Sequence, residues 1–535
     1  MAKLIVTCAP PTSNGDLHLG HLAGPYLASD VFTRTRRMLG DDVHYVSYSD
    51  DYQSYVVRKA RAEKRTPEAV ARQYGPLMAR TLAKARIEPD HFMHTLGLSD
   101  HYLEALRSFY LALKSAGTLF SQRTEVPFSK EHQLWGYEAF ARGTCPNCGD
   151  PTDASQCESC AMPPDLVRMR DVHCIVDGQP MEWVEVNQLF LDVEKNREVL
   201  QELYRRAPFR PALRDFTSSI VDEPILPWAI SRPHDWGPRV PDDPAAILHT
   251  WFGGIAGYYA ASQEWALKLG EKDLFSKYWR DKETHLIHFV GIDCAYSHAV
   301  AYPVMLAHMP VAPTVGNIFT NQFLSLHGHD FSTSRGVAIW ASEFLDSIES
   351  DSARFYLVLR APESTEQDFD LDEFRLTIND LLASRLMNAI ASVRDGKNEE
   401  PLREDVFQEK FGGALASLRQ RFIEASTVES FSMNAQGSVL VDLIGLLDAT
   451  DPRQLKALLS IYSLMATAIQ PSFSSALGAF LRLPDKWGVA WLLNGGPLPV
   501  PSSEEIGEAA PTIQEIGPDV IKKFKRTFEA AVKAA

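Results

Sequence analysis

The sequence predicts an α/β protein in which a doubly wound parallel sheet is interrupted by an inserted domain and followed by an all-α bundle. Residues 1 to about 115 alternate strand-like and helix-like segments, as such a sheet requires. A buried-strand pattern returns at residues 285–290, which indicates that the sheet resumes after an interruption. From about residue 370 onward, apolar residues recur at helical spacing, which favours a bundle of helices.

These patterns divide the chain into four regions. We expect the two halves of the sheet domain over residues 1–115 and 246–370, the insertion over 116–245, and the helical domain over 371–535. Prolines between residues 224 and 244 predict irregular chain at the end of the insertion. The strands of the sheet domain are expected at residues 4–8, 43–47, 285–290, 314–319 and 323–326.

The composition is that of a soluble, folded protein. The 535 residues are 45% hydrophobic, and no apolar run approaches the length of a membrane span. The N-terminus leads directly into the first strand, so we expect a cytoplasmic protein without a membrane partner. A net charge of −16 argues weakly against a large nucleic-acid footprint, and the basic runs at 34–37 and 522–526 are interpreted as solvated helix faces.

Four of the seven cysteines form two Cys-x-x-Cys pairs, Cys145 with Cys148 and Cys157 with Cys160. Two such pairs separated by a short loop predict a tetrahedral, structural Zn²⁺ site. Four free or disulfide-linked cysteines remain the alternative. The other three cysteines are scattered, which favours a reducing compartment.

A second motif, His18-Leu-Gly-His21, follows the strand at residues 4–8 and a turn rich in Pro, Asn and Gly. It opens a helical pattern, so backbone N–H groups and two imidazoles would face the loop. This arrangement suits the phosphates of a nucleotide. Two histidines three residues apart also fit a metal pair or ordinary surface residues.

Residues 9–21 resemble the HIGH signature of the class I aminoacyl-tRNA synthetases, and their flanks are similar to those of methionyl-tRNA synthetase. Matching segments follow in the same order at residues 49–51, 145–160, 230–232, 251–258 and 288–298. The resemblance covers roughly residues 1–395. It implies a class I synthetase fold with a zinc-knuckle insertion and an anticodon-binding-like helical domain. It also implies an enzyme that uses ATP and Mg²⁺ to form an aminoacyl-adenylate.

The resemblance also assigns roles to individual residues. Asp51 would bind the α-ammonium of the amino acid. The expected side-chain pocket consists of Cys8, Pro10, Thr12, Trp251, Tyr258, Cys294 and His298. The expected catalytic residues are His18, His21, Ser332, Ser334 and Arg335. The expected ATP contacts are Asn14, Gly20, His21, Gly291, Asp293, Asp330 and Thr333.

Several positions depart from the family pattern. Thr12 stands where the family has a pocket tyrosine, and Pro10 replaces a leucine, so the pocket is expected to suit a smaller or more polar amino acid than methionine. In residues 328–336, which match the KMSKS loop, Asp330 and Thr333 replace both lysines. Losing one preorganised group of this kind costs about 100- to 1000-fold in rate.

The departures bear on the acceptor of the aminoacyl group. Asn388 matches the family's anticodon-reading asparagine, but no tryptophan partner occurs between residues 428 and 470; Trp487 and Trp491 are interpreted as bundle core. We therefore expect transfer to a small molecule, for example a hydroxylamine in natural-product biosynthesis, and tRNA as the less favoured acceptor. A methionine–tRNA ligase and a non-catalytic amino-acid or nucleotide binder are the alternatives.

Overall fold

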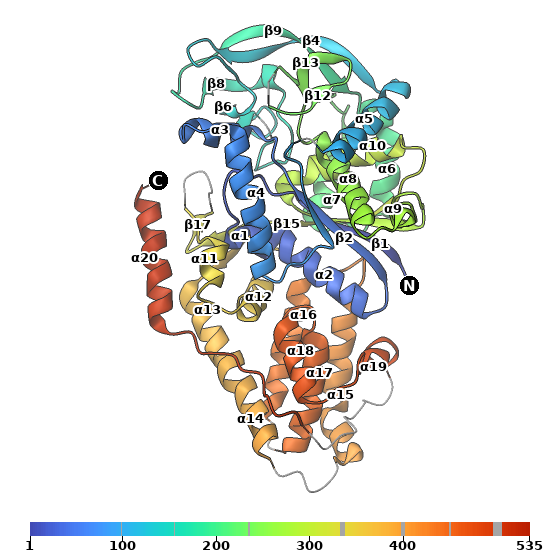
Figure 1. Cartoon of the computed structure of the whole chain (residues 1–535), viewed down its shortest axis with the longest axis vertical. Helices are drawn as coiled ribbons and strands as arrows, with labels where there is room; N and C mark the ends of the chain where they lie inside the picture. The colour runs from blue at the N-terminus through green and yellow to red at the C-terminus, as the bar shows by residue number, and fades with distance from the viewer. Residues whose placement is uncertain are drawn as a thin grey trace.

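The computed structural model of the chain is elongated, with the sheet domain between the insertion and the helical bundle (Figure 1). None of its described helices combines the length and the apolarity that a membrane crossing needs. The described residues are 1–97, 99–154, 156–233, 236–331, 337–396, 402–448, 451–495 and 506–534.

The central sheet has five parallel strands in the order β15-β14-β1-β2-β3. Its two halves are separated in sequence by the insertion, and β1 pairs with β14 across that separation. The predicted parallel sheet is therefore confirmed. Two strands differ from the prediction, because residues 91–94 form an unpredicted strand and the strand expected at residues 323–326 belongs to a separate sheet. The strands are β1 (Lys3–Cys8), β2 (Asp42–Ser49), β3 (His91–His94), β14 (Thr284–Gly291) and β15 (Thr314–Asn321).

Alternate side chains of β1 enter two different hydrophobic cores. Leu4 and Val6 belong to the core shared with the helical bundle, whereas Ile5 belongs to the core on the opposite face of the sheet. Both faces are thus covered, as a doubly wound sheet requires. The helices of this domain are α1 (Leu19–His21), α2 (Leu27–Met38), α3 (Ser54–Ala62), α4 (Pro67–Lys84), α5 (Asp100–Ser115), α8 (Gly253–Lys268), α9 (Lys272–Trp279), α10 (Tyr302–Ala307), α11 (Ala341–Leu345) and α12 (Ser350–Leu359).

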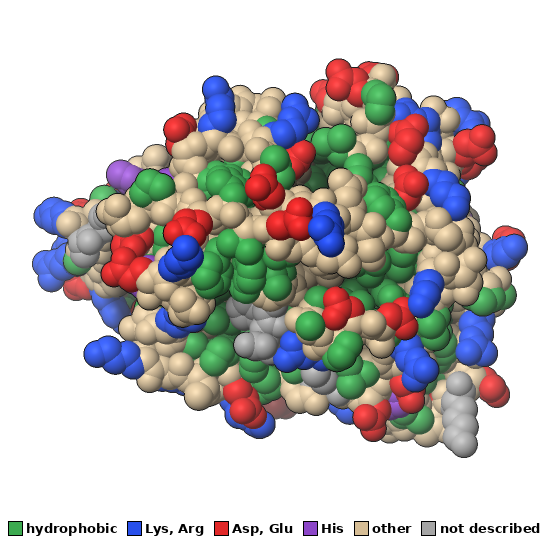
Figure 2. Space-filling view, turned by 90° about the horizontal axis from the view of Figure 1, so that it is seen from above, with side chains coloured by type: hydrophobic (Ala, Val, Ile, Leu, Met, Phe, Trp, Pro, Cys, Tyr) green, Lys and Arg blue, Asp and Glu red, His purple; other side chains and the backbone are tan. Residues whose placement is uncertain are grey.

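The insertion contains two small antiparallel sheets, β10-β9-β4-β5 and β7-β6-β8. Its proline-rich end is irregular at residues 224–227 and 236–238, as predicted, but it also contains short strands that were not predicted and that form a third sheet, β11-β13-β12. Figure 2 shows the molecule from above, where acidic and basic side chains are interspersed with apolar ones. The elements are β4 (Leu119–Ser129), β5 (Leu134–Trp135), β6 (Glu138–Thr144), β7 (Pro151–Ala154), β8 (Arg170–Cys174), β9 (Glu182–Leu191), α6 (Arg197–Arg206), α7 (Pro211–Asp222), β10 (Trp228–Ala229), β11 (Ser231–Arg232), β12 (Arg239–Val240) and β13 (Asp243–Leu248).

The chain after β15 forms a hairpin that belongs to a separate small sheet. Strand β16 (Leu324–Leu326) pairs with β17 (His329–Asp330) and with β18 (Gln367–Phe369). The turn between β16 and β17 contains His327 with φ of 48° and Gly328 with φ of 76°, both in the left-handed region. This hairpin leads into the segment that matches the KMSKS loop.

The C-terminal region is helical, as predicted. Trp491 is buried in its core and Trp487 packs against that core. The last helix runs back along α13 toward β17 (Figure 1). The helices are α13 (Leu371–Thr377), α14 (Met387–Asp395), α15 (Glu404–Glu424), α16 (Met433–Gly445), α17 (Pro452–Ala466), α18 (Pro471–Phe480), α19 (Val489–Asn494) and α20 (Pro518–Ala534).

Several residues of the two basic runs form ion pairs with acidic residues of the chain. Arg34 pairs with Asp30, Arg37 with Asp90, and Lys525 with Asp372. These contacts agree with their interpretation as helix faces.

Candidate active site at the switch point of the sheet

The direction of the strand order reverses between β1 and β14. From β1 the chain continues through β2 and β3 on one side, and from β14 it continues to β15 on the other. Ligands of open α/β sheets bind outside the carboxyl ends of the strands at this point. The His18–His21 segment follows β1, and Gly291 and Asp293 come at the end of β14, so both segments lie at the carboxyl edge of the switch point.

The His18 and His21 side chains are fixed by the first turn of the helix. Nδ1 of His18 accepts from the His21 backbone N–H at 3.3 Å, and Nδ1 of His21 accepts from the His18 N–H at 3.2 Å. The rings stack with centroids 3.7 Å apart. Because both Nδ1 atoms accept, the proton of each neutral ring is on Nε2. The pair therefore offers two Nε2–H donors.

Burial decides the charge of these imidazoles. It lowers the pKa of His21 to about 4, and burial together with the neighbouring His21 lowers the pKa of His18 well below its ordinary value. Both rings are therefore neutral at pH 7 in the free protein. As neutral rings they can still donate hydrogen bonds from Nε2–H to a phosphate.

Phe331, which follows the β16–β17 hairpin, packs against the His18 ring of this pair. Its ring stacks on His18 with centroids 4.8 Å apart. A Cβ built on Gly20 would lie 3.0 Å from Phe331 and 3.1 Å from His18, so only glycine leaves these rings undisturbed. The residue that follows the hairpin is thus in direct contact with His18. The spacing of residues in the sequence did not predict this contact.

The Asp51 carboxylate is mostly satisfied by the protein itself. Its Oδ1 accepts from Ser13 Oγ at 2.5 Å, and its Oδ2 accepts from Ser49 Oγ, Thr95 Oγ1 and the Leu96 N–H at 3.0, 3.2 and 2.7 Å. A carboxylate has about four acceptor positions, so these four donors match its capacity. Oδ1, with one donor, is the less crowded of the two oxygens.

The neighbouring Asp50 is a second buried carboxylate that the sequence analysis did not single out. It accepts from Thr250 Oγ1 and from Gln53 Nε2, each at 2.6 Å. Burial, and to a smaller extent the Asp51 and Glu138 charges, raises the pKa of Asp50 to about 7. Burial is the main reason that the pKa values of Tyr302 and Cys294 are raised, and the Asp50 charge adds a smaller contribution to both.

Tyr258 and His298, two expected pocket residues, form one buried network. The Tyr258 hydroxyl donates to the Cys8 carbonyl at 3.1 Å and lies 3.2 Å from His298 Nε2. Burial lowers the pKa of His298 to about 4, so this ring is neutral. The Cys8 thiol itself points away, to within 3.5 Å of the Tyr45 hydroxyl.

Three glycines of α8 make room for tyrosines. A Cβ on Gly254 would lie 1.7 Å from the Tyr302 oxygen, and one on Gly257 would lie 2.5 Å from the Tyr48 ring. Gly253 is similarly close to the Tyr102 hydroxyl. The glycines at residues 253, 254 and 257 therefore let the rings and hydroxyls of these tyrosines approach α8 closely.

The Asp293 carboxylate packs against the backbone of Gly291. A Cβ on Gly291 would lie 2.2 Å from Asp293 Oδ1, so the glycine leaves space for the carboxylate. Burial, assisted by the Glu158 charge from the cysteine knuckle, raises the pKa of Asp293 to about 6. The next residue, Cys294, has a pKa raised well above its ordinary value, first by burial and then by Asp293.

The remaining expected residues lie in the loops around this edge. The backbones of Thr12 and Asp50 form an isolated parallel β-bridge. The backbone N–H of Asn14 donates to the Thr12 carbonyl at 2.8 Å. Pro10 and Trp251 are half-buried, and the Trp251 N–H donates to His249 Nδ1 at 3.0 Å. The backbone of Asp330 is in β17; Ser332, Thr333, Ser334 and Arg335 lie outside the described residues.

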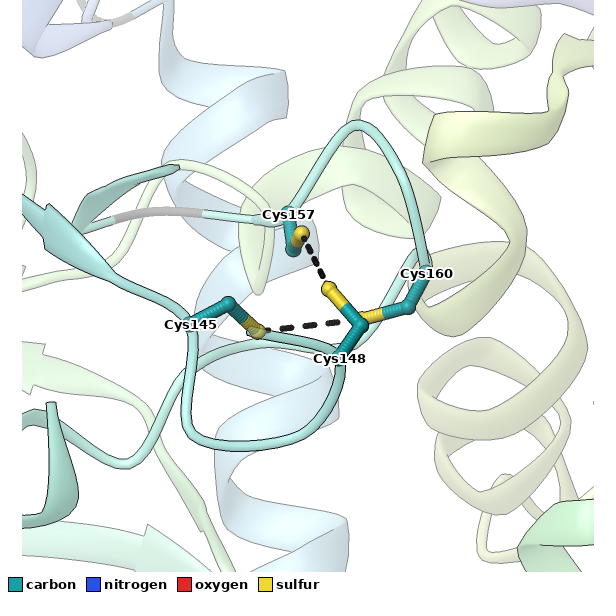
Figure 3. A group of neighbouring side chains, drawn as sticks. All are labelled: Cys145, Cys148, Cys157 and Cys160. Carbon is teal, nitrogen blue, oxygen red and sulfur yellow. Dashed lines mark hydrogen bonds between the residues drawn. The ribbon is translucent and has the colours of Figure 1, made fainter. Parts of the chain in front are cut away.

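The four paired cysteines converge as predicted (Figure 3). Their ligand atoms all lie within 4.8 Å of one another, with Sγ–Sγ distances of 3.8 Å for Cys145 and Cys160 and 3.6 Å for Cys148 and Cys157. A tetrahedral site with Zn–S bonds of about 2.3 Å places its sulfurs about 3.8 Å apart. The donor set and its dimensions therefore fit Zn²⁺.

Comparisons with known proteins agree with this architecture. The family model for the class I tRNA synthetases (M) matches residues 4–393. A methionine–tRNA ligase of Roseiflexus sp. (strain RS-1) is 32% identical over 410 residues, which cover 73% of this chain and 68% of the relative. One from Methanobrevibacter smithii is 26% identical over 563 residues, which cover 100% of this chain and 83% of the relative.

The fold is also that of a solved structure. Mycobacterium tuberculosis methionyl-tRNA synthetase in complex with methionyl-adenylate matches with a TM-score of 0.72 at 19% identity, covering 96% of this chain and 99% of that one. Sheet, insertion and family match together define an ATP-dependent ligase of the class I aminoacyl-tRNA synthetase type. Within that class, the chain belongs to the methionyl-tRNA synthetase family.

Proposed function

We propose that this chain condenses an amino acid with ATP to give an aminoacyl-adenylate and pyrophosphate at the carboxyl ends of β1 and β14. The stacked imidazoles of His18 and His21 are the observation that carries the proposal. The amino-acid carboxylate attacks the α-phosphorus, and the bond from that phosphorus to the departing pyrophosphate breaks. The two Nε2–H groups donate to phosphate oxygens as charge builds on them.

The other roles follow from position. Gly291 and Asp293 are assigned to the nucleoside because they lie beside the imidazole segment at the switch point. Asp51 Oδ1, with Asp50 beside it, is assigned to the ammonium group. Mg²⁺ would accompany ATP as the counter-ion of its phosphates, and the cysteine knuckle would hold a structural Zn²⁺.

We propose methionine as the amino acid that is activated and tRNA as the acceptor in the second step. The named relatives are methionine–tRNA ligases, and one of them aligns with the whole chain. In this reaction the tRNA hydroxyl attacks the aminoacyl carbonyl and displaces AMP. The free cysteines favour a reducing cytoplasm as the compartment.

A second candidate is favoured by the pocket. The Tyr302 hydroxyl lies in the space beside Gly254, and Thr12 replaces the family's tyrosine, so two polar groups occur in the segments expected to bind the amino-acid side chain. This favours a smaller or more polar amino acid, passed to a small nucleophile such as a hydroxylamine. Natural-product biosynthesis would then be the setting.

Amino-acid-dependent exchange of labelled pyrophosphate into ATP, over a full amino-acid panel, tests both candidates. Exchange with methionine and charging of tRNA supports the first. Exchange with another amino acid, no charging, and a hydroxamate formed with hydroxylamine supports the second. Absence of exchange with every amino acid, from a protein that still binds ATP, would contradict adenylation and leave a binder.

A further inference from the structure

Glu138, a carboxylate of the inserted domain, is buried where that domain contacts the segment before α8. It is the first residue of β6 and is 5% exposed. Its Oε1 lies 2.8 Å from Nε2 of His249 and 3.6 Å from Nε of Arg232. Burial alone would raise the pKa of Glu138, but His249 and the Arg232 guanidinium outweigh it and hold the pKa well below its usual range. The insertion therefore places an ionised carboxylate inside the molecule, and the proposed reaction steps do not use it.

The backbone of Glu138 adopts an uncommon conformation. Its φ of 47° lies in the left-handed region, which non-glycine residues rarely enter. The register between β6 and β7 shifts after Glu138, and the N–H of the next residue, Ala139, donates to Ser54 Oγ at 3.3 Å. Such conformations persist where the surrounding structure fixes them, and they cluster at functional sites. The strain in β6 thus coincides with the residue whose side chain contacts His249.

The imidazole of His249 connects this carboxylate to a residue of the expected amino-acid pocket. Its Nδ1 accepts from the Trp251 N–H at 3.0 Å, so the ring proton is on Nε2 and is donated to Glu138. An imidazole protonated at both nitrogens could not accept from Trp251, and burial lowers the pKa of His249 accordingly. The carboxylate therefore favours the tautomer in which His249 holds the backbone of Trp251.

Residues 249–251 lead directly into α8, so their position sets where that helix begins. The hydroxyl of Thr250 donates to Asp50 Oδ1 at 2.6 Å. Two buried carboxylates thus fix this segment, Asp50 from the end of the central sheet through Thr250 and Glu138 from the insertion through His249.

We propose that Glu138 is a positioning residue of the amino-acid pocket, acting through His249 to hold Trp251 and the start of α8. In this role Glu138 makes no contact with the reacting atoms. The inference rests on the proposed amino-acid activation, in which Trp251 lines the side-chain pocket, and it gives the inserted domain a part in binding the amino acid.

Glu138→Ala, Glu138→Gln and His249→Asn in the full chain test this role. The amide oxygen of the glutamine can still accept from His249 Nε2, whereas the asparagine can accept from the Trp251 N–H but is too short to reach Glu138. The matched control is Glu185→Ala, which removes an exposed carboxylate of the same domain that pairs with Arg123. Pyrophosphate exchange gives separate KM values for ATP and for methionine, or for the amino acid that the panel identifies in its place.

Glu138→Ala is expected to raise the KM for the amino acid about tenfold and to leave the KM for ATP within about twofold, because only the amino-acid pocket is misplaced. His249→Asn should raise the KM for the amino acid as well, and adding Glu138→Ala to it should have little further effect, since the connection is already cut. Glu138→Gln and the control should stay close to wild type. A role confined to joining the two domains would instead lower stability and the fraction of active enzyme without changing either KM.

A KM for the amino acid that changes less than about twofold in Glu138→Ala, in a protein that folds and exchanges pyrophosphate, overturns the proposal. An equal effect of Glu138→Ala with and without His249→Asn overturns the route through the imidazole. If Glu138→Ala does not fold, the KM of His249→Asn decides alone.

Failure of amino-acid activation is detected separately. If the wild-type protein exchanges no pyrophosphate with any amino acid, fluorine NMR of protein labelled with 5-fluorotryptophan tests the positioning role without catalysis. The Trp251 resonance, assigned by Trp251→Phe, should shift in Glu138→Ala and stay unchanged in Glu185→Ala. A Trp251 resonance that does not move in Glu138→Ala would overturn the positioning role, whether or not the protein forms an adenylate.

Discussion

The Tyr302 hydroxyl occupies the space that any side chain on residue 254 would need, 1.7 Å from the position of a Cβ on Gly254. Both residues are buried, and Tyr302 also contacts the His298 ring at a centroid distance of 4.6 Å. The glycine and the tyrosine therefore form a matched pair that sets the shape of the expected amino-acid pocket.

Gly254→Ala is expected to destabilise the fold by about 1 to 3 kcal/mol, because a methyl group there overpacks a rigid region. The same substitution should destabilise the fold less in a Tyr302→Ala background, because the hydroxyl that clashes with the new methyl group is absent. A double-mutant cycle by denaturant unfolding measures this coupling. Gly413→Ala, on a helix with open space around the glycine, is the control; equal costs in both backgrounds would refute the pairing.

His21→Ala should reduce pyrophosphate exchange about 100- to 1000-fold, because it removes one preorganised donor. His21→Gln should lose less, since its amide N–H reaches the position of Nε2 and the structure indicates a neutral donor rather than a cation. His285→Ala, an exposed histidine on β14, is the control. Equal rates in the Ala and Gln variants would contradict the donor role.

Asp50 gives a pH-dependent prediction. Its folded-state pKa of about 7 is raised above the ordinary value of 3.8, so the native state holds the proton more tightly than the unfolded chain. The resulting stabilisation is lost as pH rises through about 7. Asp50→Asn should therefore gain about 2 to 3 kcal/mol relative to wild type between pH 5 and pH 8.

Denaturant unfolding of both proteins at the two pH values measures this difference. Asp346→Asn, at a carboxylate with a largely exposed side chain, should show no comparable trend. A stability difference that stays constant with pH would mean that Asp50 is charged in the folded protein.

The cysteine cluster predicts one tightly held metal ion per chain. Cys148→Ser should lower the zinc content, measured by elemental analysis, and should lower the melting temperature of the insertion, because metal binding contributes directly to folding. Cys294→Ala, which belongs to no group of neighbouring potential metal ligands among the described residues, should keep the metal. Full zinc retention in Cys148→Ser would show that the four sulfurs do not form the site.

The central sheet was predictable because its strands are long, buried and rich in β-branched residues, as in β1 and β14. The short strands β10 and β11 were missed, since two residues carry no periodic signal and their pairing depends on distant partners. The cysteine knuckle was predictable from spacing alone because a metal constrains its ligands locally.

The candidate site was less accessible to sequence reasoning. Adjacent carboxylates Asp50 and Asp51 look alike in sequence, and only the folded positions of Ser13, Ser49 and Thr95 show which one is already satisfied. The Phe331 contact with His18 joins segments more than 300 residues apart, so no local pattern could indicate it. The resemblance indicated where to expect the site, and the packing of the folded chain shows how its residues contact one another.

The altered loop provides the last prediction. Asp330 follows His329 in β17 and stands where the family has a lysine. If adenylation takes place as proposed, a negative charge at this position would repel the departing pyrophosphate. Asp330→Lys should therefore raise the rate of pyrophosphate exchange by at least tenfold, whereas Asp330→Asn, which only removes the repulsion, should give a smaller gain. Exchange kinetics at saturating amino acid measure both. A lysine variant no faster than wild type would contradict the role assigned to residue 330.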